Sequence, residues 1–169
     1  KYLNGELENE EDFFKPSSRT LLIHGDIRKV SNNLIDKILH ERFNVTEVDI
    51  VTGGAPCESF SMAGNRKEDD ERNNLFLNLE RIAKHVDAKM VLFENVKGLF
   101  SKKSNGVTGK MYQDICDEFE REDSKGVAFK LASRDKDVVL LKSSNYGTPQ
   151  ERERIFLVGV NRKYNVEFK

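Results

Sequence analysis

Several features that would assign a chain to a class at once are missing from this sequence. Its 169 residues contain no apolar run of about 18 residues and no signal-peptide pattern, so nothing argues for a membrane span or for export. Only two cysteines are present, Cys57 and Cys116, which favours reduced thiols in a cytoplasmic protein over a disulfide framework. The length, the 37% of apolar residues and the absence of an internal repeat suit a single domain with a buried core.

An excess of charge of one sign is also missing. The 28 basic and 29 acidic side chains leave a net charge of −1, so the whole chain does not carry the electrostatic footprint of a general nucleic-acid binder. Any contact with a nucleic acid must therefore be local or depend on other protein. Residues 1–18 are polar and acidic and predict a flexible leader, which leaves residues 19–169 for the folded part.

Proline is rare, and one of the three prolines, Pro56, stands directly before Cys57. Residues 48–51 (VDIV) are typical of a buried strand, and the Gly-Gly-Ala-Pro that follows predicts a sharp turn, because glycine permits unusual backbone angles and proline fixes φ. Such a turn would hold the Cys57 side chain at the carboxyl end of a strand, where open α/β sheets bind their ligands. Cys57 is therefore a candidate nucleophile. The alternative is that it is a small buried apolar side chain.

Short apolar runs alternate with amphipathic stretches along the chain, and this alternation predicts an α/β fold with a doubly wound sheet. Strands are expected at residues 20–23, 48–51, 89–93, 138–141 and 154–160. Helices are expected at residues 31–39, where Ser31 would be the N-cap, at 75–86 and at 111–120. The polar segments 64–74 and 98–109 are expected to be loops, and the first is long enough to be a functional lid.

Glu94 and Asn95 come directly after the expected strand 89–93. The same carboxyl-end rule places Glu94 beside the Cys57 turn. A carboxyl group there could act as an acid or as a hydrogen-bond partner for a substrate ring, although a Glu after a strand is more often a cap or a surface charge.

Two arginines follow the turn that contains Pro149. Because Arg152 and Arg154 alternate, both guanidinium groups face the same side if the segment is extended. That arrangement suits gripping a phosphate or a planar carbonyl. The alternative is a solvated run of charges.

Together these motifs resemble those of the cytosine-5 DNA methyltransferase family. Cys57 with its flanks matches that family's nucleophile motif, residues 94–96 match its Glu-Asn-Val motif, and residues 150–154 match its Gln-x-Arg-x-Arg motif. The motif between the first two is matched by Asp70, Arg72, Leu75 and Phe76. Several matches in order, from about Leu21 to Val160, are a strong signal where each alone is weak. The resemblance implies a Rossmann-like, mostly parallel sheet of the S-adenosylmethionine-dependent methyltransferase type.

The activity that the resemblance implies is transfer of a methyl group from S-adenosylmethionine to carbon 5 of a cytosine flipped out of duplex DNA. The Cys57 thiolate would add to carbon 6, because carbon 5 alone is a poor nucleophile. Glu94, protonated, would hydrogen-bond ring nitrogen 3 and the exocyclic amine. Arg152 and Arg154 would hold the ring carbonyl oxygen, a neighbouring phosphate or both. Asn95 would fix the Cys57 turn.

The resemblance also implies binding positions. The segment 64–74 corresponds to the family's closing loop, and its candidate phosphate contacts are Arg66, Lys67 and Arg72. Asp26 and Ile27 resemble contacts to the adenine of the cofactor, while Pro56 and Leu75 match further cofactor-site positions. The alternative for Asp26 is a simple turn residue. No metal is implied.

The sequence departs from the family in places. Ala55 stands where Pro or Phe is common, and Glu58 stands where Gln is usual, which puts a negative charge near a site that must approach a phosphodiester. The glycine-rich first motif, its acidic ribose-binding residue and the target-recognition domain have no counterpart, and the first residue is Lys1 rather than Met. We therefore expect a partial catalytic domain, incomplete at both ends, that does not methylate DNA by itself.

Three alternatives share these motifs: a tRNA cytosine-5 methyltransferase, a silent regulator or nucleic-acid-binding module, and one half of a split enzyme. Residues 145–154 resemble the DNA enzymes more closely, and a binding module has no need of a positioned thiol such as Cys57. Because restriction-modification systems are the commonest setting of such enzymes in bacteria, the expected partners are double-stranded DNA and a cognate restriction endonuclease. The full-length protein is expected to be monomeric, cytoplasmic and without membrane contact.

Overall fold

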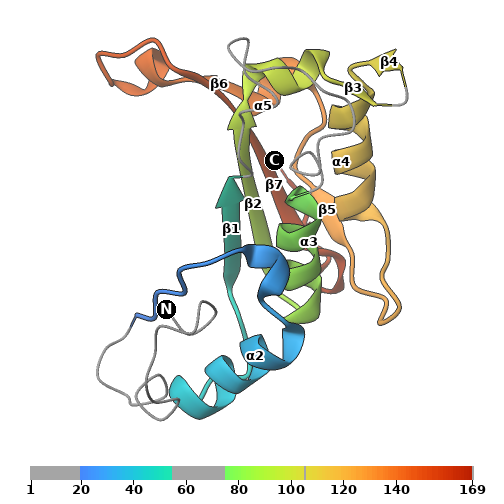
Figure 1. Cartoon of the computed structure of the whole chain (residues 1–169). Helices are drawn as coiled ribbons and strands as arrows, with labels where there is room; N and C mark the ends of the chain where they lie inside the picture. The colour runs from blue at the N-terminus through green and yellow to red at the C-terminus, as the bar shows by residue number, and fades with distance from the viewer. Residues whose placement is uncertain (1–19, 55–74, 105, 169) are drawn as a thin grey trace. The chain divides into compact units, whose positions relative to one another are not determined.

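The computed structural model describes residues 20–54, 75–104 and 106–168. The chain divides into two compact units, Lys1–Val48 and Asp49–Lys169, and each is considered by itself. The sheet lies in the second unit, as does nearly all of the buried apolar core that the described residues form (Figure 1).

The described residues of the first unit, 20–48, contain one continuous helical stretch. Helix α2 (Asn32–Lys37) begins after Ser31, whose side chain accepts a hydrogen bond from the backbone N of Leu34 at 3.2 Å, so the expected N-cap is confirmed. A π-helical turn, η3 (Ile38–Arg42), continues the helix, and a 3-10 turn, η2 (Ile27–Lys29), precedes it.

The strand expected at residues 20–23 is wrong. These residues form no regular element, and they pair with no strand of the described part of the chain. Leu22 is 84% exposed, so the apolar run has no buried face to hold it in a sheet. An apolar run predicts a strand only where a neighbouring strand and a core are there to receive it.

Among its described residues, the second unit contains a five-stranded mixed sheet in the order β1-β2-β7-β5, with β6 also paired to β7. The bounds are β1 (Ile50–Gly54), β2 (Met90–Val96), β5 (Phe129–Leu131), β6 (Leu140–Lys142) and β7 (Glu153–Asn161). β1 and β2 run parallel, whereas β7 is antiparallel to all of its neighbours. The α/β class is confirmed, but the described part of the sheet is mixed rather than mostly parallel. Residues 143–152 join β6 to β7. This connection is too short for the crossover that parallel neighbours require, so the two strands run antiparallel.

Several expected boundaries shift. The strand expected at 48–51 begins at Ile50 and includes both glycines, and β2 continues through the Glu-Asn-Val motif. The first part of 138–141 belongs to a helical turn, α5 (Lys136–Val139). The expected loop 98–109 contains a 3-10 helix, η5 (Lys97–Ser101), and a small hairpin of β3 (Lys103–Ser104) and β4 (Val107–Thr108).

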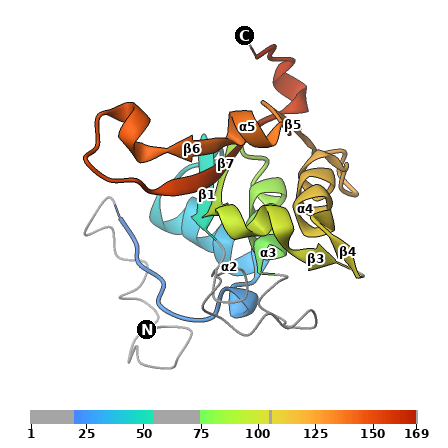
Figure 2. The ribbon, with the colours of Figure 1, turned by 90° about the horizontal axis from the view of Figure 1, so that it is seen from above.

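Helices α3 (Phe76–His85) and α4 (Lys110–Glu120) confirm two predicted helices and cover one face of the sheet (Figure 2). The ring of Phe93 on β2 lies 6.1 Å from that of Phe119 on α4, measured between centroids. Gly53, which pairs with Phe93 in the sheet, lies directly under Leu79 of α3, where a Cβ would come within 2.9 Å of that side chain. The absence of a side chain at Gly53 therefore lets α3 approach β1.

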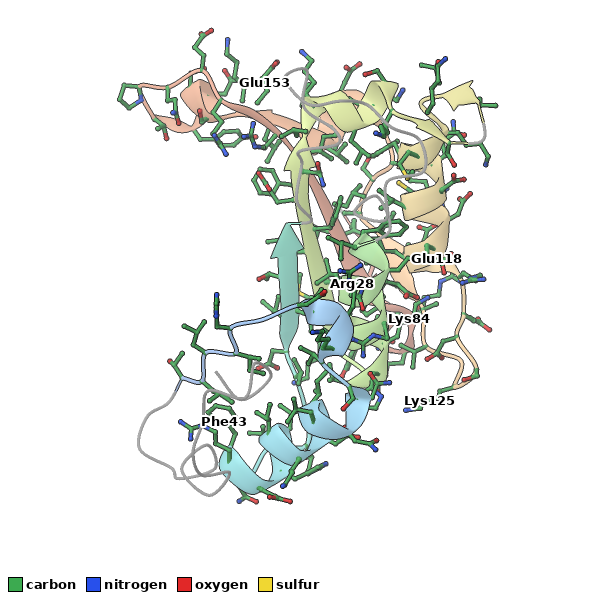
Figure 3. All side chains as sticks on the ribbon, in the orientation of Figure 1. Arg28, Phe43, Lys84, Glu118, Lys125 and Glu153 are labelled. Atoms are coloured by element: carbon green, nitrogen blue, oxygen red, sulfur yellow. The ribbon has the colours of Figure 1, made fainter. Side chains whose placement is uncertain are left out.

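A buried lysine ties α3 to α4. The side-chain nitrogen of Lys84, 3% exposed, donates to the carbonyl oxygens of Glu118 at 2.9 Å and Arg121 at 2.7 Å, and forms an ion pair with Glu80 at 2.5 Å (Figure 3). The last carbonyls of a helix have no partner within it, so the ammonium group satisfies them and complements the helix dipole.

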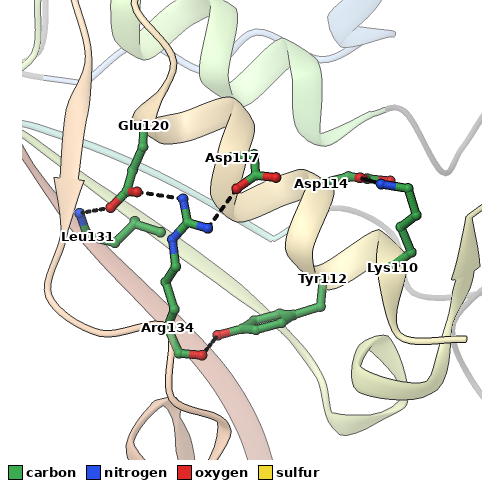
Figure 4. Close-up of polar contacts among 7 residues, drawn as sticks. All are labelled: Lys110, Tyr112, Asp114, Asp117, Glu120, Leu131 and Arg134. Carbon is green, nitrogen blue, oxygen red and sulfur yellow. Dashed lines mark hydrogen bonds and ion pairs between the residues drawn. The ribbon is translucent and has the colours of Figure 1, made fainter.

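A second polar network joins α4 to β5 (Figure 4). The guanidinium group of Arg134 contacts Asp117 at 2.6 Å and Glu120 at 2.5 Å, and Glu120 also accepts a hydrogen bond from the backbone N of Leu131 at 3.1 Å. Cys116 lies on the same helix, and burial raises its pKa to about 11. This thiol is therefore a core side chain and not a nucleophile at neutral pH.

Candidate functional site

Glu94 lies at the edge of the sheet where β1 ends. The parallel register pairs Gly54, the last residue of β1, with Glu94 on β2. Glu94 therefore lies beside the last residue of β1, whereas the Cys57 turn beside which it was expected lies outside the described residues. Gly54 leads directly into the segment that contains Pro56 and Cys57, which lie outside the described residues.

Gly54 leaves room for the Glu94 carboxylate. A Cβ at Gly54 would lie 3.1 Å from Oε2 of Glu94 and 3.5 Å from its carbonyl oxygen. The first of these distances is tighter than an ordinary van der Waals contact. The sequence showed this glycine as part of a turn, but its closeness to Glu94 follows from the register alone.

Arg154 completes an ion pair with Glu94. In the antiparallel pairing of β2 and β7, Arg154 faces Val96, one step along the same sheet face from Glu94. Its Nε lies 2.9 Å from Oε1 of Glu94, with the two side chains 22% and 38% exposed. The pair is thus half-buried but accessible to a ligand. It combines the acceptor oxygens of a carboxylate with the donors of a planar guanidinium group.

Asn95 points away from this pair, because successive side chains of a strand face opposite sides of the sheet. It is 1% exposed, and its Oδ1 accepts a hydrogen bond from the backbone N of Val96 at 2.8 Å. Its buried Nδ2 has no hydrogen-bond partner among the described residues. Leaving such a donor unpaired costs about 1–3 kcal/mol, so the side chain is suited to hold a nearby carbonyl.

Arg152 is not brought into the ion pair. It precedes β7 and is exposed, and its backbone carbonyl oxygen and N form hydrogen bonds with Ser143. The two arginines that looked equivalent in the sequence therefore occupy different environments, since only Arg154 contacts Glu94.

The first unit holds two of the expected cofactor residues. The carboxylate of Asp26 accepts a hydrogen bond from the backbone N of Arg28 at 2.9 Å. It accepts three more from the Arg28 guanidinium group, at distances between 2.7 and 3.1 Å. These hydrogen bonds lower the pKa of Asp26 to about 2. Ile27 follows directly and is 36% exposed. An acceptor beside an exposed apolar surface suits an adenine ring, although Arg28 at present occupies the acceptor.

Of the remaining expected site residues, only Leu75 lies among the described residues. Leu75 is half-buried and directly precedes α3. Outside the described residues lie Pro56, Cys57, Arg66, Lys67 and Arg72.

In residues 20–54, 75–104 and 106–168, no three His, Cys, Asp or Glu side chains form a group that could hold a metal ion. None of the helices in those ranges has the length and apolar character needed to cross a lipid bilayer.

Several known proteins with similar sequences are named type II methyltransferases. The chain is 36% identical over 119 residues to the type II methyltransferase M.DdeI of Desulfomicrobium norvegicum, covering 70% of this chain and 26% of that protein. It is 35% identical over 142 residues to the type II methyltransferase M.AquIA of Picosynechococcus, covering 83% of this chain and 54% of that protein. The chain thus spans between about a quarter and about half of these curated relatives.

A solved structure shows the same fold. A prophage-encoded protein of E. coli, described as a DNA modification methyltransferase, superposes with a TM-score of 0.63 at 23% identity, over 89% of this chain and 36% of that one. The sequence matches the family of C-5 cytosine-specific DNA methylases over residues 12–169. With the Glu-Asn-Val strand and the Arg154 strand paired as described, the chain belongs to the C-5 cytosine-specific DNA methylase family.

Proposed function

We propose that this chain carries the catalytic centre of a DNA cytosine-5 methyltransferase. The observation that carries the proposal is the Glu94–Arg154 ion pair at 2.9 Å, set at the end of β1 from which the chain runs on to Cys57. Membership of the family supports the reaction, and the pair supplies groups that such a reaction needs.

Arg154 has more N–H donors than its ion pair with Glu94 uses. The Nε of Arg154 is directed to Glu94 and its Nη1 donates to the carbonyl oxygen of Glu153 at 2.8 Å. Its Nη2 has no partner among the described residues and would remain for the carbonyl oxygen of a cytosine ring. Glu94, protonated in the complex, would donate to ring nitrogen 3 and accept from the exocyclic amine. The two side chains would thus hold the polar edge of one base.

Cys57 would supply the nucleophile. Its thiolate adds to carbon 6, and the displaced electron pair makes carbon 5 reactive toward a methyl group. Loss of the carbon 5 proton to a base, with breakage of the sulfur–carbon bond, then restores the ring and the thiolate. Asn95 would fix the turn that carries Cys57 through its unpaired Nδ2, and Arg152 would hold a neighbouring phosphate.

S-adenosylmethionine would supply the methyl group when bound. Asp26 and Ile27 would contact its adenine, and Pro56 and Leu75 would contribute further contacts. The carboxylate and the exposed apolar side chain fit this role in kind, provided that Arg28 turns aside.

The proposed substrate is double-stranded DNA, with the phosphate contacts Arg66, Lys67 and Arg72. The names of relatives such as M.DdeI support a restriction-modification setting with a cognate endonuclease. We propose a monomeric cytoplasmic enzyme.

The proposal is tested by covalent trapping of the full-length protein. Incubation with S-adenosylmethionine and duplex DNA containing 5-fluorocytosine should give an adduct stable to denaturation, because fluorine at carbon 5 cannot leave as a proton does. Cys57→Ser should abolish the adduct. Cys116→Ser is the matched control, and it should retain the adduct because Cys116 is buried with a raised pKa.

An adduct that persists in Cys57→Ser would contradict the assignment of the nucleophile. A comparison of duplex DNA with tRNA as methyl acceptors tests the substrate class. Faster methylation of tRNA would replace the DNA proposal.

A further inference from the structure

An exposed loop, residues 143–152, links β6 to β7 and extends beyond both strands (Figure 1). Residues 145–152 are all exposed, and the 3-10 turn at its start, η6 (Ser143–Tyr146), buries no residue. The loop leaves the sheet at the end of β7 that carries Arg154. It therefore lies next to the candidate site without belonging to the core.

One serine gives this loop a fixed shape. The backbone N of Ser143 donates to the carbonyl oxygen of Arg152 at 2.9 Å, and its hydroxyl donates to the carbonyl oxygen of Gln150 and accepts from the backbone N of Arg152 at 3.1 Å. Its carbonyl oxygen accepts from the backbone N of Gly147, whose φ is 80°. A loop closed in this way at its neck loses little conformational entropy when it binds.

The charges around the loop leave one cation available. Glu151 forms an ion pair with Lys142 at 2.8 Å, and Glu153 forms one with Lys97 at 2.9 Å. Arg152, by contrast, has no side-chain partner among the described residues. Both acidic groups are thus neutralised, and the loop presents a guanidinium group suited to an anion such as a phosphate.

Tyr146 is the exposed aromatic side chain of this loop. Tyr146 is 68% exposed. The neighbouring side chains are polar: Ser144, Asn145 and Thr148. An apolar protein interface would surround an aromatic anchor with aliphatic side chains, whereas an isolated ring beside a cation is typical of contacts to bases and phosphates.

We propose that this loop is a nucleic-acid contact in which the Tyr146 ring stacks on an unpaired base beside the phosphate held by Arg152. The inference rests on the proposed function, because a nucleic acid bound at the Glu94–Arg154 pair would lie alongside the loop. A base offers its face to such a ring only where the duplex is opened, and extrusion of a target base opens it. The loop should therefore favour an opened strand over an intact duplex.

The sequence offers a direct probe, since it contains no tryptophan. In Tyr146→Trp the emission of the chain comes from position 146 alone. We expect a mixed-sequence oligonucleotide to quench this emission, at lower concentration when it is single-stranded or mismatched than when it is fully paired. The matched control is Tyr164→Trp. Tyr164 is 40% exposed in η7 (Arg162–Tyr164), beyond the opposite end of β7, and its replacement should not be quenched.

Affinity and its salt dependence provide the second measurement. Tyr146→Ala should weaken binding to the single strand about tenfold with an unchanged salt slope, because stacking releases no counterions, and Tyr146→Phe should bind normally. Arg152→Ala should reduce the slope by about one.

Several results would overturn the proposal: equal quenching at both positions, no quenching at position 146, unchanged affinity of Tyr146→Ala, or preference for the paired duplex. The affinities of Tyr146→Ala and Tyr146→Phe for the single strand test the proposal even if Tyr146→Trp does not fold. None of these binding measurements depends on formation of the covalent adduct. Failure of the loop proposal is therefore distinct from failure of the covalent trapping.

Discussion

Asp26 and Arg28 show how a single neighbour can set the availability of a proposed ligand group. Four hydrogen bonds from Arg28 occupy the carboxylate of Asp26. A carboxylate has about four lone-pair sites, so little capacity remains for another donor. A ligand amine at Asp26 must therefore compete with Arg28.

Replacing Arg28 should change both the pKa of Asp26 and the affinity for S-adenosylmethionine. In Arg28→Ala the pKa of Asp26 should rise from about 2 toward 3.8, as followed by carboxyl chemical shifts in an NMR titration. Because the folded pKa is depressed, the stabilisation from this group is present above pH 3.8 and is lost as the pH falls through about 2. Calorimetry should show tighter binding of S-adenosylmethionine to the full-length variant. Arg28→Lys keeps the positive charge but loses the forked guanidinium group, so its Asp26 pKa should lie between those of the wild type and Arg28→Ala. An unchanged Asp26 pKa in Arg28→Ala would refute this explanation.

Gly54 makes room for a neighbouring carboxylate. In Gly54→Ala the new Cβ would approach Oε2 of Glu94 to 3.1 Å, so the flexible carboxylate must shift by a few tenths of an ångström from its contact with Arg154. We expect covalent trapping by the full-length protein to slow by about tenfold or more, since small displacements at a reacting site are costly. The melting temperature should change little.

Gly159→Ala is the contrasting control. There the added Cβ meets Val91 at 2.9 Å and Phe129 at 3.0 Å, both in the core. Overpacking of this kind should cost about 1–3 kcal/mol in the free energy of unfolding. Equal effects of the two variants on trapping would show that Gly54 has no special relation to Glu94.

Helices α3 and α4 allow a comparison of two lysine–carboxylate pairs with the same spacing. Lys84 with Glu80 is buried and also caps the end of α4, whereas Lys110 with Asp114, 2.7 Å apart, lies on the surface. Lys84→Met should lower the free energy of unfolding by about 2–4 kcal/mol, because it leaves a largely covered carboxylate and two carbonyls without their donor. Lys110→Met should cost at most about 0.5 kcal/mol. Urea denaturation of both variants measures the difference, and similar losses would contradict it.

Elements were predictable from the sequence when they were long enough to show a period. Helices α2, α3 and α4 have several apolar positions on one face, and α2 has a serine cap. The strands β5 and β6 have three residues each, which is too short for alternation to appear. The segment 20–23 is apolar but has no core to face, so its composition misled the prediction.

The candidate site was predictable from the sequence only in part. A strand followed by Glu94 gave its position at the edge of the sheet, because parallel strands end together. The pairing with Arg154 depends on the register of β2 with β7, which no local pattern contains. Arg152 and Arg154 therefore looked equivalent until the register separated them.

The two units contribute unequally to the whole molecule. Among the described residues, Ile38 is the only buried apolar side chain before Asp49, and the others lie between Phe76 and Val160. A chain that begins at Asp49 should therefore keep its sheet and its cooperative unfolding. Circular dichroism and thermal denaturation of residues 49–169 test this expectation, and loss of the transition would show that the sheet requires the first unit.

The central place of β7 has a consequence for the order of folding during synthesis. β2, β5 and β6 all pair with β7, yet of the five described strands β7 is the last to leave the ribosome. The pair between Met90 and Val160 closes a loop of roughly 70 residues, which costs entropy before any contact repays it. Until β7 emerges, the edge of β2 that β7 later covers is unpaired, so the nascent chain depends on timely synthesis of β7 to avoid association through that edge.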